Sequence, residues 1–212
     1  MHMNIINKIR QKIIAVKKNR LKNKFGYCGK NVNIGFTKII SPQNLYLHDN
    51  TNIFEGFLFL SAGGSFTMKE GSGAAQNLTV VTGNHGRCVG RRFKDKEMFV
   101  ERKAETSTDI VVEEDVWIGA NVTLLPGANV GRSATIGANS VVRGSVPPYA
   151  VVAGNPGKVV GFNFTPEEII EHEKALYPEE QRLSIEFLEK NYKKYFLDHI
   201  KEIKAYTSLI CK

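Results

Sequence analysis

Histidine is the side chain best suited to moving a proton near neutral pH, and the chain has five. His85 ends the segment VVTGNH (residues 80–85) and precedes a stretch rich in arginine and lysine. The other four lie near the terminus, at a predicted turn or in predicted helices, where solvated or capping roles dominate: His2, His48, His172 and His199. A neutral imidazole can accept a proton from a hydroxyl group and return it to a leaving group. His85 is therefore the leading candidate for general-base chemistry.

A six-residue repeat follows this histidine. Aliphatic residues recur at every sixth position: Val112, Ile118, Leu124, Val130, Ile136 and Val142. Between them stand residues that tolerate positive φ angles or tight turns: Asp115, Asn121, Gly127, Ser133 and Asn139. A period of six fits neither a helix nor an ordinary strand. It predicts a parallel β-helix in which each hexad is a short strand plus a turn and three hexads close one coil.

The same spacing recurs before the histidine in two registers, one at 47, 53 and 59 and the other at 68, 74 and 80. Between Val80 and Val112 the period is lost. We interpret residues 86–108, which contain seven arginines and lysines between positions 87 and 103, as a loop extruded from the coil wall. Long loops inside compact domains are usually binding or lid elements.

Both ends of the chain have helical patterns. Residues 3–24 place Ile6, Ile9, Ile13 and Val16 on one stripe of a basic helix. At the other end, Thr165 followed by proline and two glutamates predicts a helix start, and residues 180–205 form a second amphipathic stretch. We therefore divide the chain into a helix (1–25), a β-helix domain (26–162) and a helical tail (163–212) that caps the open end of the coil.

The net charge of +8 is concentrated near the N-terminus. Residues 1–48 hold ten Lys or Arg and no acid, whereas the rest holds nineteen basic and twenty-one acidic residues. The main body therefore shows no nucleic-acid signal. The basic helix fits peripheral contact with an anionic membrane, or packing against its own body or a neighbouring subunit. Three scattered cysteines and no legible signal peptide favour the cytoplasm.

Residues 117–160 resemble the hexapeptide-repeat acyltransferases. The specific features are Trp117-Ile118-Gly119, Pro147-Pro148 and Ala153-Gly154-Asn155-Pro156. The resemblance spans about residues 26–162. Within the family, the sequence is similar to the branch of maltose, galactoside, xenobiotic and surface-polysaccharide O-acetyltransferases. It implies a mainly β fold, a left-handed parallel β-helix, assembled as a homotrimer with active sites between subunits. It also implies acetyl-coenzyme A as cosubstrate, no metal, and a sugar or lipid-linked sugar as acceptor.

The resemblance assigns roles to single residues. His85 matches the catalytic base, and Trp117 matches a ring beside the thioester arm and the acceptor. Backbone at Ala120 and Ala138 matches positions that line the coenzyme. Three further residues match family positions that contact the coenzyme: Arg143, Gly144 and Lys158. Gly161 stands where some members carry another basic residue. Asn84 and Glu55 are the acceptor-side candidates, and Glu55 departs from the amide of some relatives.

Alternatives remain open at this stage. Within the same fold class, the chain could be a streptogramin- or chloramphenicol-type, serine or amino-sugar acyltransferase. A γ-type carbonic anhydrase would bind zinc through three histidines, but only His48 and His85 fall on the predicted coils. A non-catalytic scaffold would use the fold alone.

Overall fold

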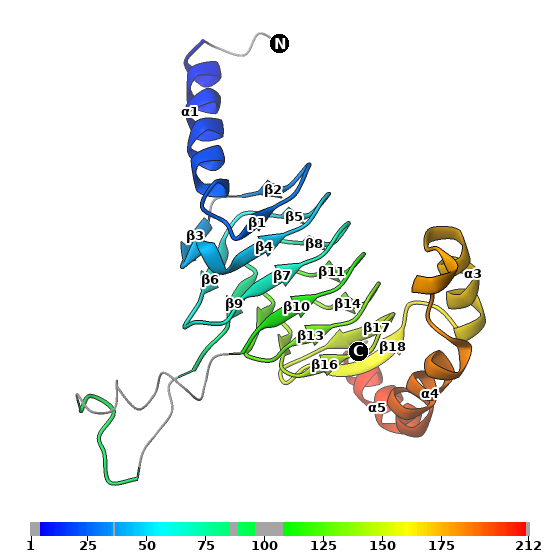
Figure 1. Ribbon diagram of the computed structural model, residues 1–212. Helices are drawn as coiled ribbons and strands as arrows, with labels where there is room; N and C mark the ends of the chain where they lie inside the picture. The colour runs from blue at the N-terminus through cyan, green and yellow to red at the C-terminus, as the bar shows by residue number, and fades with distance from the viewer. Residues whose placement is uncertain (1–4, 36, 85–88, 96–107, 211–212) are drawn as a thin grey trace.

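The structure, a computed structural model, describes residues 5–35, 37–84, 89–95 and 108–210. A parallel β-helix forms most of it, with helix α1 (Ile5–Lys22) projecting from the first coil and three helices following the last coil (Figure 1). Successive strands join sheets A, B and C in turn, so each coil is a triangle with one strand per side. In the described chain, five complete coils precede a sixth that has strands in sheets A and B only. The prediction of a parallel β-helix is confirmed.

The strands are short, as a hexad requires. Sheet A contains β1 (Tyr27–Cys28), β4 (Leu45–Leu47), β7 (Phe66–Met68), β10 (Ile110–Val112), β13 (Asn129–Val130) and β16 (Ser145–Val146). Sheet B contains β2 (Asn33–Ile34), β5 (Asn52–Ile53), β8 (Gly73–Ala74), β11 (Trp117–Ile118), β14 (Thr135–Ile136), β17 (Ala150–Ala153) and β18 (Lys158–Phe162). Sheet C contains β3 (Thr37–Ile40), β6 (Phe57–Leu60), β9 (Thr79–Val81), β12 (Thr123–Leu124) and β15 (Val141–Val142).

The six predicted aliphatic positions all point into the coil, and none is more than 3% exposed. Parallel register stacks equivalent residues of neighbouring coils, so Ile118 pairs with Ala74 on one side and Ile136 on the other. The five predicted turn residues have φ between 54° and 80°. Because few side chains tolerate that region, the Asn, Asp, Ser and Gly at these corners keep the coil triangular.

The sixth coil ends differently from the others. Strand β18 runs antiparallel to β17 and covers the last edge of sheet B. Helix α3 (Pro166–Leu176) then begins with a capping box, in which Thr165 and Glu168 bond each other's backbone N–H groups. The amphipathic stretch 180–205 is not one element. It contains 3₁₀ turn η3 (Glu179–Gln181) and α4 (Ile185–Tyr195), and it reaches α5 (Ile200–Ile210) through the 3₁₀ turn η4 (Leu197–His199).

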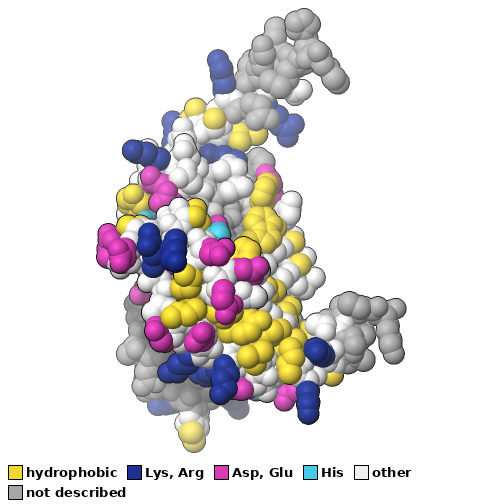
Figure 2. All heavy atoms as spheres, turned by 90° about the vertical axis from the view of Figure 1, so that its right-hand side faces the viewer, with side chains coloured by type: hydrophobic (Ala, Val, Ile, Leu, Met, Phe, Trp, Pro, Cys, Tyr) yellow, Lys and Arg dark blue, Asp and Glu magenta, His cyan; other side chains and the backbone are white. Residues whose placement is uncertain are grey.

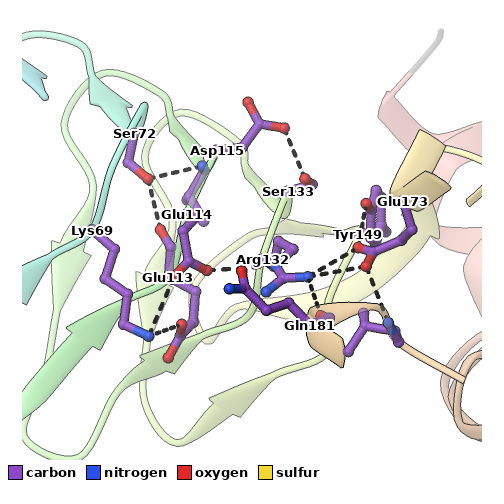
Figure 3. Close-up of polar contacts among 12 residues, drawn as sticks. Lys69, Ser72, Glu113, Glu114, Asp115, Arg132, Ser133, Tyr149, Glu173 and Gln181 are labelled. Atoms are coloured by element: carbon purple, nitrogen blue, oxygen red, sulfur yellow. Dashed lines mark hydrogen bonds and ion pairs between the residues drawn. The ribbon is translucent and has the colours of Figure 1, made fainter. Parts of the chain in front are cut away.

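A buried polar cluster attaches the tail to the coils (Figure 3). Glu173 of α3, 1% exposed, accepts hydrogen bonds from the Tyr149 hydroxyl (2.7 Å), Arg132 Nη1 (3.0 Å) and the Leu183 N–H (3.1 Å). Tyr149 occupies a corner at φ 62° and is fully buried. Burial, together with the bond to Glu173, raises the pKa of Tyr149 above its ordinary value. The tail is therefore held by a carboxylate that three donors share.

No helix among the described residues is long and apolar enough to cross a membrane.

Candidate functional site

The chain leaves the coil wall after β9 and rejoins it before β10 at one point, and most of the predicted loop of residues 86–108 lies outside the described residues. Thr82, which follows β9, is fully buried and donates its N–H to the Leu60 carbonyl (3.1 Å). The Thr108 N–H in turn donates to the Thr82 carbonyl (2.9 Å), so the two ends of the loop are tied together. This loop root lies at the corner between sheets C and A, in the third coil. Asn84 is exposed there, whereas His85 lies outside the described residues.

Trp117 lies on the outer surface of sheet B, in the fourth coil. Its side chain is 48% exposed, which is unusual for so large a ring. The ring lies over Gly73 of the preceding coil, where a Cβ would come 3.3 Å from the nearest ring atom. Gly73 therefore leaves room for the indole to lie along the sheet.

The loop root and Trp117 lie in neighbouring coils, on opposite sides of the triangular cross-section. The C–A corner is the vertex that sheets C and A share, and sheet B is the side facing away from it. One copy of the chain does not bring the two together. A site that uses both must take each from a different copy.

The small residues predicted to line the coenzyme lie together at the B–C corner. The Asn139 N–H donates to the Ala120 carbonyl (2.9 Å), which places Ala120 and Ala138 on adjacent coils. Gly119 approaches so closely that a Cβ would lie 2.7 Å from the Ala138 nitrogen. Glu55 is exposed at the same corner, two coils nearer to the N-terminus.

The predicted basic contacts lie in the last coils. Arg143 and Gly144 form the C–A corner of the fifth coil, with Arg143 exposed and Gly144 at φ 76°. Lys158 begins β18 opposite Ala153 and is also exposed. It lines a cavity of about 610 Å³, together with the segment from Ala153 to Val160.

The other wall of this cavity comes from the tail, which the sequence analysis did not connect with the site. Its lining residues from α4 and from the η4–α5 region include Tyr195, His199, Glu202, Ile203 and Tyr206. The Tyr206 hydroxyl lies over Gly154, 3.0 Å from where a Cβ would stand. The helical pattern could identify these helices but not where they fold back.

The charged side chains at the corner between sheets A and B pair with one another or with the tail. Lys69 pairs with Glu113 and Glu114, and Arg132 pairs with Glu114 and Glu173 (Figure 3). Burial opposes ionisation of Glu114, yet a backbone hydrogen bond and the two cations outweigh it and lower the pKa of that carboxyl group. Among the described residues, no three His, Cys, Asp or Glu side chains are grouped as metal ligands.

Comparison with known proteins agrees with this architecture. Residues 109–144 match the family described as bacterial transferase hexapeptide (six repeats). Galactoside O-acetyltransferase from Lactococcus lactis is 33% identical over 60% of this chain and 51% of its own length. The chain spans less than two thirds of the length of the curated relatives it matches.

Solved structures agree as well. A maltose O-acetyltransferase from Clostridium difficile 630 superposes with a TM-score of 0.58 at 25% identity, covering 68% of this chain and 73% of that one. The hexapeptide-repeat acetyltransferase VCA0836 from Vibrio cholerae, complexed with acetyl-coenzyme A, shares the fold with a TM-score of 0.60 at 24% identity, covering 71% and 78%. The repeat and the triangular coil therefore make the chain similar, in sequence over residues 109–144 and in fold, to the hexapeptide-repeat acetyltransferases.

Proposed function

We propose that this protein transfers an acetyl group from acetyl-coenzyme A to a hydroxyl group of a sugar or polysaccharide precursor. The names of the relatives support acetyl transfer and a sugar acceptor. The observation that carries the proposal is the placement of the loop root and Trp117 on opposite sides of the triangular cross-section, in neighbouring coils. That placement fits a homotrimer whose active sites lie between neighbouring copies. A thioester donor drawn from the cell's acetyl-coenzyme A fits a cytoplasmic protein.

Heights along the coil axis support such an assembly. The loop root belongs to the third coil and Trp117 to the fourth, so they differ by one coil, or about 5 Å. Rotation about a threefold axis parallel to the coils leaves heights unchanged. In side-by-side copies with parallel axes, the loop root of one copy therefore lies within about one coil of the height of Trp117 in the next.

In this proposal His85 removes the proton of the acceptor hydroxyl as its oxygen attacks the thioester carbonyl. The carbon–sulfur bond then breaks, and the imidazolium returns the proton to the sulfur of coenzyme A. A backbone N–H at the corner of Ala120 and Ala138 is the candidate donor to the oxyanion. Trp117 lines the arm of the donor.

In this arrangement coenzyme A and the acceptor sugar bind at different heights along the coil axis. Arg143, Gly144 and Lys158 lie in the fifth and sixth coils, and we assign the phosphate-bearing end of coenzyme A to the cavity beside Lys158. Glu55 and Asn84 lie in the second and third coils, and we assign the acceptor to that side. A compact active site between the third and fourth coils separates the two.

The direct test measures thiol release from acetyl-coenzyme A with a panel of sugars. We expect His85→Ala to lower turnover by about 10²- to 10⁴-fold, the usual contribution of a general base. His48→Ala is the matched control, because His48 follows β4 at the A–B corner, away from the loop root. Full activity in His85→Ala would refute the assignment of the base, and absence of transfer to every hydroxyl acceptor would refute the reaction.

Mixed assemblies test whether the site is shared. We expect chains carrying His85→Ala to be inactive alone, as are chains carrying Trp117→Ala. When the two variants are coexpressed in equal amounts, on the order of a quarter of the interfaces should be active. These are the interfaces in which one neighbour contributes an intact His85 and the other an intact Trp117. No recovery in mixed trimers would show that one copy supplies both residues.

A further inference from the structure

Helix α1 carries exposed apolar side chains. Figure 1 shows it projecting beyond the first coil, and contacts with the body are concentrated at its C-terminal end. There Lys22 donates to the Val32 carbonyl, and Phe25 packs against the core. Further out, Ile13 and Val16 are each 52% exposed. Residues three apart share one helix face, so these two form an apolar stripe that the described part of the chain leaves half-exposed.

Every charged residue of α1 is basic. At 100° per residue, Lys12 lies on one side of the stripe, and Arg10 and Lys17 lie on the other. All three are exposed. On the face drawn in Figure 2, acidic and basic side chains are interspersed over the coils, whereas the projecting helix carries basic and apolar ones.

A second copy of α1 fits this surface poorly. The stripe has the three-four spacing of a coiled-coil seam, but positions 10, 12 and 17 are those that face each other across such a seam. All three carry the same charge and would repel. The acidic groups Glu113 and Glu114 of the body offer no alternative, because Lys69 and Arg132 already pair with them.

An anionic lipid surface satisfies both features of α1. Aliphatic side chains enter the boundary between headgroups and acyl chains, while flanking lysines and arginines extend to the phosphates. We propose that α1 is a membrane-docking helix, with Ile13 and Val16 as its inserted residues and Arg10, Lys12 and Lys17 as its lipid contacts. This proposal is independent of the acetyl-transfer reaction.

The test is sedimentation of the full chain with vesicles of phosphatidylcholine, alone or mixed with phosphatidylglycerol. We expect binding to the mixed vesicles only, with a loss of binding as NaCl rises from about 0.1 M to about 1 M, because the screening length shortens from about 10 Å to about 3 Å. The pair Ile13→Gln and Val16→Gln keeps charge and helix propensity and should lower the partition coefficient at least about ten-fold.

The matched control is Leu176→Gln with Leu197→Gln, which removes two leucines that are 55% and 51% exposed on the tail. It should bind like the wild type. Equal binding to neutral vesicles, or unchanged binding by the α1 pair, would overturn the proposal. So would an α1 pair that alters only the oligomeric state in solution, since the stripe would then cover another copy. Acetyl transfer measured on a soluble sugar should be the same in all these variants.

Discussion

Replacing Glu173 with glutamine should release the tail without unfolding the coils. Glutamine keeps the size of the side chain but presents an NH₂ group to donors that need an acceptor. Breaking a fully buried ion pair typically costs about 3–5 kcal/mol. The cost here is smaller, because Arg132 is 15% exposed and keeps Glu114 at 3.5 Å and the Tyr177 ring at 3.9 Å. We expect the free energy of local unfolding of the tail to fall by about 2–3 kcal/mol.

Hydrogen exchange followed by mass spectrometry measures this quantity, because it resolves local opening from global unfolding. The expected loss corresponds to exchange that is roughly 30- to 150-fold faster in the amides of α3 and around Leu183, at one factor of ten per 1.4 kcal/mol. Peptides from the coils, such as the one containing Val130, should exchange as in the wild type. Tyr149→Phe removes only one of the three donors and should cost about 1–2 kcal/mol.

Glu171→Gln is the matched control, since Glu171 lies on the same helix but is exposed. It should change the tail's stability by less than about 0.5 kcal/mol. Unchanged exchange in Glu173→Gln would refute the view that this carboxylate holds the tail. Equal acceleration in tail and coil peptides would refute the view that the tail opens separately.

Two further predictions concern the coils. Asn121 has φ 58° and accepts a hydrogen bond from Asn77 (2.9 Å). Asn121→Ala should therefore lower the free energy of unfolding by about 1–2 kcal/mol, and Asn121→Gly should lower it by less. Urea unfolding that shows alanine to be the milder change would contradict this. The pKa of Glu114 is lowered relative to its ordinary value of 4.5, so its contribution to stability is present above that pH and is lost as pH falls through the lowered pKa. Urea midpoints measured downward from pH 6 should therefore fall less steeply in Glu114→Gln, and identical slopes would count against it.

The coils were predictable because their determinants are local and periodic. The six-residue spacing alone predicts that Leu124 points inward, and the tolerance of asparagine for positive φ predicts a corner at Asn121. Corners can also be filled by residues that carry no such signal. Tyr149 takes the corner position of the sixth coil and depends on Glu173, twenty-four residues further on, for its hydroxyl contact. No pattern in the sequence links those two residues.

The candidate site was predictable as a set of residue types and much less as an arrangement. Lys158 could be singled out by its motif, yet the cavity beside it also needs Tyr206, which reaches it only after the tail turns back at η4. The stretch 180–205 has the periodicity of one helix, and the break at Phe196 has no proline or glycine to indicate it. Contacts that depend on such a reversal are set by packing between elements, which periodicity does not describe.

The triangular section also restricts how specificity for the acceptor is encoded. In the proposed trimer, a residue on a corner of one copy meets what the neighbouring copy presents within about one coil of the same height, because threefold symmetry permits no shift along the axis. Glu55 and the loop root of one copy lie in successive coils on different corners, so in the proposed trimer a shared acceptor site would pair the loop root of one copy with Glu55 of its neighbour. Acceptor choice would then depend on residues from both copies, with the basic charge of the predicted loop 86–108 favouring an anionic acceptor.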